Sequence, residues 1–376
     1  MLQEPGTEAG LASASASAVA VPSRTLLVMA GGTGGHIFPG LAVADAVKAA
    51  GWRVVWLGNP EGMEARLVPA HGHEMVMLRF AALRGKGLLR KLLLPFNLLR
   101  GFWQALRRLR EVRPDVVIGL GGFVSFPAGM MAALKGIPLV LHEQNSTPGL
   151  ANRVLAGVAD RILTGFPEAL KKSTWLGNPV RADIIALPPP TVRYAERRDQ
   201  QAPLHLLVVG GSLGAQALNE ALPVALSQLP EGQRPHVVHQ SGESHRQALQ
   251  DAYAQAGVQA HCVAFIEDMA GAYAWADLVV CRAGALTVAE LAAAGVASLL
   301  VPYPHAVDDH QTGNAHFLAN AGAAILLPQN EMTAERLLAA ITLDRESLLQ
   351  MALQAHDLAK PDATARVAQV CMELAK

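Results

Sequence analysis

Short apolar runs rich in Val, Leu and Ile alternate with longer segments of helical periodicity from Arg24 onward. We interpret the runs as strands and the intervening segments as helices. This alternation favours parallel sheets that helices cover on both faces. The predicted strands are residues 25–30, 53–58, 115–120, 138–142, 160–164, 206–210, 236–240, 259–265, 277–281 and 298–301, and the first predicted helix is 40–50.

The two halves of the chain repeat one pattern. The turn Gly31-Gly32-Thr33-Gly34-Gly35-His36 follows one predicted strand, and Gly210-Gly211-Ser212 follows a strand of the second half. An aspartate also precedes an apolar run in both 114–122 and 276–284. We therefore expect two doubly wound α/β domains facing one cleft, since ligands of such sheets lie at the carboxyl ends of the strands. The predicted division is a disordered tail at 1–23, domains at 24–180 and 181–360, and a C-terminal helix at 361–376 that returns to the first domain.

Composition narrows the class of protein. The 376 residues carry no net charge, and 51% are apolar against 16% charged, which excludes a disordered chain and offers nucleic acid no global basic surface. The three cysteines are scattered, which argues against a disulfide framework or a structural zinc site and favours a reducing compartment. No apolar run reaches the roughly 18 residues that span a bilayer. The first 23 residues contain no Lys or Arg, unlike a secretory signal.

One segment is strongly basic. Residues Arg79 to Arg110 contain nine Lys or Arg and no acid, interleaved with Leu, Phe and Trp at largely helical spacing that Pro95 interrupts or kinks. An amphipathic helix with a solvated basic face is one interpretation. The one-sided charge and the aromatic residues favour an anionic membrane surface as the partner. Nucleic acid is less favoured, because no other segment supplies a basic surface or an aromatic platform.

Polar side chains cluster after three predicted strands. His142-Glu143-Gln144-Asn145 follows one strand, Cys281 to Glu290 follows another, and His305 to Asn314 forms a polar loop. Each cluster could serve only structure, as a buried histidine or a helix-start acid does. Their position at strand ends is nevertheless where ligand groups are expected. The last cluster lacks regular metal-ligand spacing, so amide recognition of a sugar is the simpler use.

These motifs together resemble a known family. In order they are Gly31–His36, Gly121-Gly122-Phe123, His142–Asn145, Gly177-Asn178-Pro179-Val180-Arg181, Gly210–Ser212, Cys281–Glu290, His310-Gln311 and Asn314-Ala315. The set resembles the bacterial peptidoglycan glycosyltransferases of GT-B family 28, the undecaprenyl-diphospho-muramoylpentapeptide beta-N-acetylglucosaminyltransferases, over about residues 25–376. The resemblance implies a two-domain GT-B fold and inverting transfer of N-acetylglucosamine from its UDP donor to the muramoyl-pentapeptide lipid. It implies no cofactor and a peripheral position at the cytoplasmic face of the cell (inner) membrane, with cell-wall or division proteins as further partners.

The resemblance also implies roles for individual residues. Thr33, Gly34 and Gly35 would contact the donor sugar or diphosphate side of the cleft, and Asn145 and Gln311 the sugar. Arg181 and Ser212 would hold the diphosphate. The backbone of Ile266 would contact the uracil. The nucleoside would lie against Ala285, Leu286, Thr287, Val288, Ala289 and Glu290, with the Glu290 carboxylate on the ribose.

An inverting displacement needs a base for the acceptor hydroxyl and stabilisation of the departing diphosphate. His36 is our leading candidate base, because a helix N-terminus disfavours imidazolium and keeps the ring able to accept a proton. Glu143 is the alternative base. Since the sequence contains no Asp-x-Asp motif, we expect Arg181, backbone N–H groups and helix dipoles to neutralise the diphosphate without a metal ion.

Competing functions differ in what they require. Another GT-B enzyme of UDP-sugars, such as a glycolipid glycosyltransferase or a UDP-N-acetylglucosamine 2-epimerase, would use the same fold. A nicotinamide-dependent dehydrogenase is disfavoured, because neither glycine turn fits G-x-G-x-x-G. Residues 57–60, at the end of the second predicted strand, also lack the acidic residue that would bind the ribose of the cofactor. A nucleotide-sugar sensor would not need the basic segment. The chain departs from the family pattern at Leu213, Ala283 and Phe123, where the family usually has Gln, Ser and often Tyr.

Overall fold

The computed structural model describes residues 24–80, 88–198, 203–211 and 214–375, without the side chains of 88–94, 198 and 307. The predicted tail at 1–23 and the predicted diphosphate ligand Ser212 lie outside the described residues. So does part of the basic segment, at 81–87.

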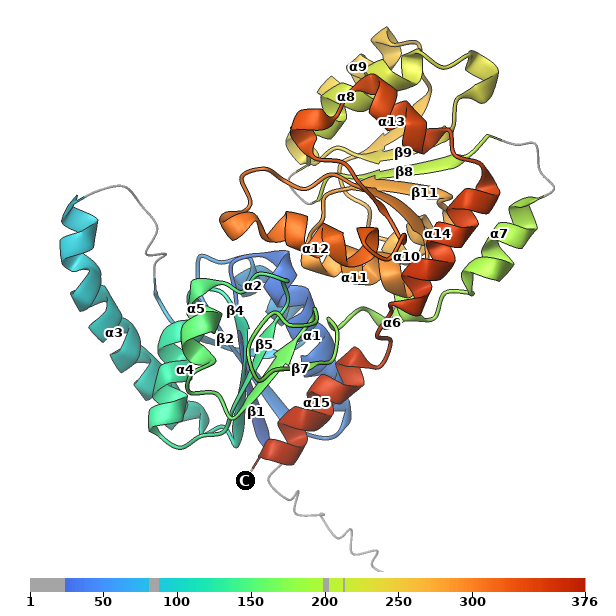
Figure 1. Cartoon of the computed structure of the whole chain (residues 1–376). Coiled ribbons are helices and arrows are strands. Elements are labelled where there is room, and N and C mark those ends of the chain that lie inside the picture. The colour runs from blue at the N-terminus through green and yellow to red at the C-terminus, as the bar shows by residue number, and fades with distance from the viewer. Residues whose placement is uncertain (1–23, 81–87, 199–202, 212–213, 376) are drawn as a thin grey trace, which may run out of the picture.

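The first half of the chain forms a sheet of seven parallel strands in the order β3-β2-β1-β4-β5-β6-β7 (Figure 1). Its strands are β1 (Thr25–Ala30), β2 (Arg53–Gly58), β3 (Glu74–Met77), β4 (Val116–Gly121), β5 (Leu139–Glu143), β6 (Arg161–Thr164) and β7 (Thr174–Trp175). The helices between them are α1 (Gly34–Ala49), α2 (Glu64–Ala70), α3 (Leu88–Val112), α4 (Ser125–Leu134) and α5 (Leu150–Leu155).

The second half forms a sheet of six parallel strands in the order β10-β9-β8-β11-β12-β13. Its strands are β8 (His205–Val209), β9 (His236–Gln240), β10 (Ala260–Val263), β11 (Leu278–Cys281), β12 (Ala297–Leu300) and β13 (Ile325–Leu326). The associated helices are α6 (Ala182–Ile185), α7 (Pro190–Arg198), α8 (Gln216–Ser227), α9 (Arg246–Gln255), α10 (Met269–Trp275), α11 (Ala285–Ala294), α12 (His310–Ala319), α13 (Ala334–Ile341) and α14 (Arg345–Asp357).

The central strands are buried on both faces, which explains their continuous apolar sequences. Every residue of β1 and of β4 is buried. Along β1, Leu26 and Val28 pack into one hydrophobic cluster, whereas Leu27 and Met29 pack into a second cluster on the opposite face. Such strands bury apolar area at both faces, which drives the sheet to form between two helical layers.

The aspartates that precede strands in both halves have a common structural role. Asp115 accepts a 2.6 Å hydrogen bond from the Thr25 N–H at the start of β1. Asp277 accepts a 2.9 Å hydrogen bond from the His205 N–H at the start of β8. Each carboxylate therefore satisfies the first donor of the neighbouring central strand. The repeated sequence pattern thus marks equivalent positions of two similar sheets.

The last helix, α15 (Ala363–Leu374), lies beside the first sheet rather than the second (Figure 1). Its Val367 and Cys371 belong to the hydrophobic cluster that contains Val43 and Val47 of α1. The Arg24 guanidinium also donates to the Ala375 carbonyl across 351 positions of sequence. The polypeptide therefore crosses between the two sheets twice.

The strands predicted from sequence are confirmed to within a few residues, and three short ones, β3, β7 and β13, were not predicted. Two helix predictions need correction. Helix α1 begins at Gly34 rather than Gly40, so His36 lies within its first turn. Helix α3 is continuous through Pro95 rather than interrupted there, although Pro95 cannot donate a backbone hydrogen bond within the helix. Within the described part of the chain, no helix has the length and apolar character needed to cross a membrane.

Candidate active site

The strand order reverses between β1 and β4 in the first sheet and between β8 and β11 in the second. In open parallel sheets, the connections on either side of such a reversal diverge to opposite faces and leave a crevice at the carboxyl ends of the strands. The glycine turns at Gly31 and Gly121 follow β1 and β4, and those at Gly210 and Gly284 follow β8 and β11. These four glycine turns therefore lie at the two places where ligands are expected.

His36 lies directly after the glycine turn at Gly31, and its ring packs on the glycine turn at Gly121. Its Nδ1 atom lies 3.0 Å from the Gly31 carbonyl oxygen. Since a carbonyl only accepts, Nδ1 carries the proton and Nε2 keeps a free lone pair in the neutral ring. Gly121, at φ +111°, leaves room for the imidazole, because a Cβ there would lie 2.9 Å from Nε2. A Cβ on Gly122 would lie 2.3 Å from the Gly31 oxygen, so the two turns interlock under His36.

The environment of His36 favours the neutral ring. The side chain is partly exposed, yet protein surrounds most of the imidazole, and this loss of hydration lowers its pKa below the usual value. The hydrogen bond to Gly31 and the negative charge of Glu143 act in the opposite direction. A neutral imidazole with Nε2 unprotonated is the form that can accept a proton from a hydroxyl.

Glu143 is buried and its carboxylate is fully engaged. It accepts hydrogen bonds from the backbone N–H and the side-chain amide of Asn145 at 2.9 and 3.2 Å. It also accepts from the Gly149 N–H at 3.3 Å and from the Asn152 amide at 2.8 Å. These bonds fix the loop that carries Asn145. They favour Glu143 as a positioning group and His36 as the base.

Asn145 meets the second half of the molecule through Asn314. The buried Asn314 amide donates to the Asn145 oxygen at 3.3 Å and to the Ala283 carbonyl at 3.2 Å. Its oxygen accepts from the Ser146 N–H at 2.8 Å. The exposed pair of Arg153 and Asp308, 2.8 Å apart, lies at the same junction. Loops from both halves thus meet where the donor sugar was predicted to bind.

Arg181 and Glu290 lie side by side. The guanidinium of Arg181 is 3.4 Å from the Glu290 carboxylate, whose other oxygen accepts from the Tyr273 hydroxyl at 3.1 Å. Burial raises the pKa of Glu290, and the Arg181 charge and the Tyr273 hydrogen bond oppose that rise. Tyr273 was not predictable from the sequence, because an isolated tyrosine in a helix belongs to no motif. A guanidinium suits a diphosphate and a carboxylate suits ribose hydroxyls. These two groups are adjacent in a nucleotide, as Arg181 and Glu290 are here.

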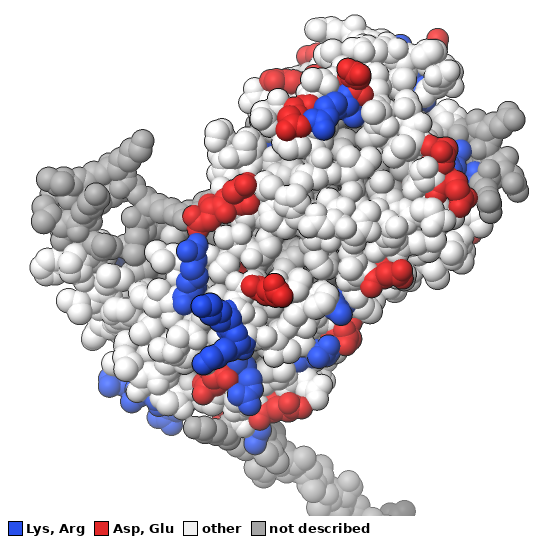
Figure 2. Space-filling model, in the orientation of Figure 1, with Lys and Arg blue, Asp and Glu red and all other residues white. Residues whose placement is uncertain are grey.

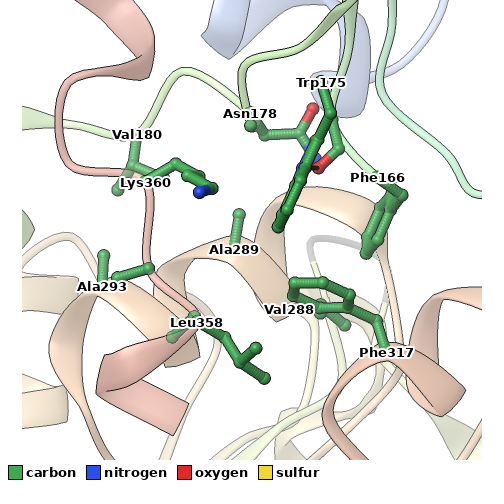
Figure 3. A pocket seen from close by; sticks show the side chains of 14 residues that line it. Phe166, Trp175, Asn178, Val180, Val288, Ala289, Ala293, Phe317, Leu358 and Lys360 are labelled. Atoms are coloured by element: carbon green, nitrogen blue, oxygen red, sulfur yellow. Dashed lines mark hydrogen bonds between the residues drawn. The ribbon is translucent and has the colours of Figure 1, made fainter. Parts of the chain in front are cut away.

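The predicted nucleoside segment 285–290 occupies the start of α11 and faces two environments. Val288 and Ala289 line a crevice between the halves, together with Phe166, Trp175 and Phe317 (Figure 3). Phe317 contacts Phe166 edge-on, with ring centroids 5.2 Å apart. Leu286, Thr287 and Glu290 are partly exposed, whereas Ala285 is buried. The side chains of Val288 and Ala289 therefore serve the contact between the halves.

The loop that carries Ile266 is tied to the second glycine turn by Gln240. The Ile266 N–H donates to the Gln240 side-chain oxygen at 3.2 Å, and the Gln240 amide donates to the Gly211 carbonyl at 2.7 Å. Gln240 is buried at the end of β9. Sequence reasoning missed it, because only the fold brings these two loops together.

The remaining predicted residues lie at the starts of α1 and α12. Thr33 is exposed before α1, and its carbonyl accepts from the His36 N–H at 3.1 Å. Gly34 and Gly35 begin α1, where backbone N–H groups have no partner within the helix. The Gln311 oxygen accepts from the Tyr303 N–H at 2.9 Å, which orients its amide. In the described part of the chain, no group of three or more His, Cys, Asp or Glu is arranged to hold a metal ion.

Comparisons with known proteins agree with this arrangement. The glycosyltransferase family 28 N-terminal domain matches residues 26–164, and the glycosyltransferase family 28 C-terminal domain matches residues 205–367. A protein of Dechloromonas aromatica named UDP-N-acetylglucosamine--N-acetylmuramyl-(pentapeptide) pyrophosphoryl-undecaprenol N-acetylglucosamine transferase is 67% identical over 94% of this chain and 100% of its own length. The protein of the same name from Cupriavidus metallidurans is 63% identical over 94% of this chain and 99% of its own length.

Solved structures support the fold. The crystal structure of Acinetobacter baumannii MurG is similar with a TM-score of 0.81 and 43% identity, covering 93% of this chain and 99% of that one. The calicheamicin glycosyltransferase CalG4, at 16% identity, has a TM-score of 0.64 over 94% of this chain and 98% of its own, which shows a shared GT-B fold alone. The chain belongs to glycosyltransferase family 28, and within it to the family of UDP-N-acetylglucosamine--N-acetylmuramyl-(pentapeptide) pyrophosphoryl-undecaprenol N-acetylglucosamine transferases.

Proposed function

We propose that the chain transfers N-acetylglucosamine, with inversion, from UDP-N-acetylglucosamine to the 4-hydroxyl of undecaprenyl-diphospho-N-acetylmuramoyl-pentapeptide. The products are UDP and the disaccharide lipid precursor of peptidoglycan. The observation that carries the proposal is 67% identity to a transferase of that name over its whole length. In this proposal the two halves have different roles. Residues 24–180 bind the acceptor and the membrane, and residues 181–360 bind the UDP-sugar. Residues 361–376 return to the first half.

His36 is the proposed base of the reaction. Its Nε2 lone pair takes the proton of the acceptor hydroxyl as the oxygen attacks the anomeric carbon, and the bond from that carbon to the UDP oxygen breaks on the opposite side. Nδ1 stays protonated, because it donates to the Gly31 carbonyl at 3.0 Å. Burial lowers the pKa of His36, so the base form persists in slightly acid solution.

The second half holds the donor in this proposal. Glu290 accepts hydrogen bonds from the ribose hydroxyls, and Arg181, 3.4 Å away, meets the negative diphosphate. Backbone N–H groups at the Gly210 turn, together with Ser212, complete the diphosphate site. The backbone of Ile266 contacts the uracil, while Asn145 and Gln311 recognise the sugar.

The outer face of α3 is the proposed membrane contact, at the cytoplasmic face of the cell membrane. Phe96, Leu99 and Trp103 share one side of this helix and are 71%, 66% and 61% exposed. Arg100, Arg107 and Arg110 are exposed nearby on the same helix. Lys and Arg side chains also gather in a stripe on the first half of the molecule (Figure 2). An apolar ridge with basic flanks fits an anionic lipid surface.

The decisive experiment combines the protein with labelled UDP-N-acetylglucosamine and a muramoyl-pentapeptide diphosphate lipid, without added metal. We expect labelled disaccharide lipid and an equal amount of UDP. Parallel reactions offer diacylglycerol as the acceptor, or no acceptor at all. Transfer to diacylglycerol, or epimerised UDP-sugar without acceptor, would assign a different GT-B activity and overturn the proposal.

A further inference from the structure

Glu64 is a buried carboxylate that is hydrogen-bonded to the glycine turn at Gly31–Gly32. It opens α2 and is 1% exposed. Its Oε1 accepts from the Asn59 N–H at 2.9 Å, and its Oε2 accepts from the Gly32 N–H at 3.1 Å. None of the ion pairs among the described residues involves Glu64. Burying a carboxylate without a cation is costly, so its retention needs a reason.

Glycines from two loops make space for this side chain. A Cβ on Gly31 would lie 2.4 Å from Glu64 Oε1, and a Cβ on Gly62 would lie 2.3 Å from Oε2. A Cβ on Gly58 would lie 2.6 Å from Glu64 Cγ. The turn after β1 and the loop after β2 thus both lack side chains where the carboxylate lies. Glu64 is therefore built into the turn that precedes His36.

The contact with Gly32 reaches His36 through a single peptide unit. The Gly32 N–H and the Gly31 carbonyl belong to the same planar amide. Glu64 accepts from the N–H side of that amide at 3.1 Å, and His36 Nδ1 donates to its oxygen side at 3.0 Å. A carboxylate on the N–H polarises the amide and makes its oxygen a stronger acceptor, because consecutive hydrogen bonds reinforce one another.

We propose that Glu64 is a positioning residue that acts on His36 through the Gly31–Gly32 peptide. It holds the peptide in the orientation that keeps the proton on Nδ1, leaves Nε2 free, and stabilises the imidazolium that forms during transfer. A carboxylate that contacts the catalytic imidazole directly has the same effect in other enzymes. The inference rests on the proposed role of His36 and adds a second residue to that role.

Three titratable groups on three different elements act on His36. Glu64 on α2 and Glu143 at the end of β5 raise its pKa, and His310 at the start of α12 lowers it. Only Glu64 is joined to the ring through the Gly31 carbonyl, whereas Glu143 is bonded to its own loop. Removing the Glu64 charge should therefore lower the pKa of His36 and weaken its preference for the Nδ1–H form.

The test compares Glu64→Gln and Glu64→Asp with the control Glu61→Gln, which alters an exposed carboxylate of the same loop. In Glu64→Gln the new side chain carries no charge. Its amide nitrogen is a donor, so only its oxygen can accept, and the hydrogen bonds from the Asn59 and Gly32 N–H groups can no longer go to two separate oxygens. We expect kcat to fall roughly tenfold or more, with the KM for the UDP-sugar unchanged, and the acid limb of the pH–rate profile to move about half a unit lower. Glu64→Asp keeps the charge but is too short for Gly32, so kcat should fall with a smaller pH shift.

The second readout needs no substrate. Nitrogen-15 NMR of the His36 ring reports its tautomer and pKa in the wild type and in each variant. We expect the wild type to hold Nδ1–H, and Glu64→Gln to mix the tautomers and lower the pKa. If wild-type turnover with the proposed substrates is absent, this titration still tests the link between Glu64 and His36.

Two results would overturn the inference. One is a folded Glu64→Gln enzyme with wild-type kcat and an unmoved acid limb. The other is a loss of kcat with an unchanged His36 tautomer and pKa, which would assign Glu64 to loop stability alone. If Glu64→Gln does not fold, Glu64→Asp is judged by the same two readouts.

Discussion

The oxygen of Asn314 accepts a 2.8 Å hydrogen bond from the backbone N–H of Ser146, which joins α12 of the second half to the loop after β5 of the first. Asn314 is completely buried, and its amide also reaches Ala283 and Asn145. One side chain thus connects loops of both halves at the proposed sugar site. Its loss would affect the junction and the donor contact together.

Asn314→Ala should lower the free energy of unfolding by about 1–3 kcal/mol, because buried donors and acceptors lose their partner. The KM for the UDP-sugar should rise as Asn145 loses its orientation. Denaturant unfolding and steady-state kinetics measure the two effects. The exposed Asn320 of the same chain segment offers a control, since Asn320→Ala should change neither. Unchanged stability in Asn314→Ala would show that the junction does not depend on this side chain.

His36→Ala should reduce kcat by on the order of 10²–10⁴-fold, the usual contribution of a general base, while UDP affinity stays the same. Burial lowers the pKa of His36. Wild-type kcat/KM should therefore fall only at pH values below the ordinary pKa range of histidine, where the ring becomes protonated. Rate measurements across pH and UDP calorimetry provide the readouts. The exposed His71 serves as control through His71→Ala. Near-normal turnover of His36→Ala would require another base.

Glu290→Ala should weaken UDP binding about tenfold or more, because the ribose hydroxyls lose a charged acceptor. Tyr273→Phe removes the 3.1 Å hydrogen bond that orients Glu290 and should weaken binding roughly threefold. Calorimetry with UDP and with 2′,3′-dideoxy-UDP separates the causes. Glu290→Ala and the wild type should bind the dideoxy analogue equally. A large difference for that analogue would place Glu290 away from the ribose.

Acid should destabilise the fold through two buried histidines. Burial lowers the pKa of His142 to about 4 and that of His239 to about 3. In the unfolded chain both titrate near 6.5, so the unfolded state binds more protons below that pH and stability falls between pH 6.5 and 4. His142 alone should cost on the order of 3 kcal/mol over that window.

Burial keeps the His142 ring neutral, and its hydrogen-bond partners fix which nitrogen carries the proton. Nε2 lies 3.0 Å from the Gly177 carbonyl oxygen and Nδ1 lies 3.0 Å from the Gln144 amide nitrogen, so Nε2 donates and Nδ1 accepts. Denaturant titrations from pH 7 to pH 4 measure the loss of stability that comes from His142, with His142→Gln as the variant. Its stability should be lower at pH 7 but should vary less with pH. An equal pH dependence would assign the acid loss to other groups.

The exposed ridge of α3 gives a membrane prediction. Changing Phe96, Leu99 and Trp103 together to Ser should abolish flotation with anionic vesicles, because the variant loses its apolar contact area. Replacing several of Arg84, Lys86, Arg90 and Lys91 by Glu should have the same effect through charge. Val224→Ser, at a position 58% exposed in the second half, is the control. Retained flotation of both variants would exclude the segment from Arg79 to Arg110 as the contact.

Much of the fold follows from local sequence. The apolar runs that became β1, β4 and β8 are buried on both faces, so their continuous hydrophobicity predicts them directly. The short strands β3, β7 and β13 have two to four residues at or near the edges of their sheets. Two residues, as in β7 and β13, are too few for a periodic signal. The four residues of β3 begin with the exposed Glu74, and none of them is fully buried.

Local sequence also located the candidate site, because glycine turns and polar clusters mark the carboxyl ends of parallel strands. It could not distinguish how the polar groups are used. Glu143 was an alternative base in sequence terms, and its four hydrogen bonds with the following loop and α5 favour a positioning role. Val288 and Ala289 lie in a predicted ligand segment, but their side chains line the contact between the halves.

Two doubly wound sheets and the glycine turn that precedes His36 were predictable from the order of residues alone. The groups that surround that turn were not, because they come from distant parts of the chain. Glu64 lies 32 positions from Gly32 along the chain and Gln240 lies 29 from Gly211, yet each forms a hydrogen bond with its turn. Periodicity and motifs report neighbours within one element. Which buried donor meets which acceptor depends on how separate elements pack, because satisfying those groups is a requirement of the whole fold.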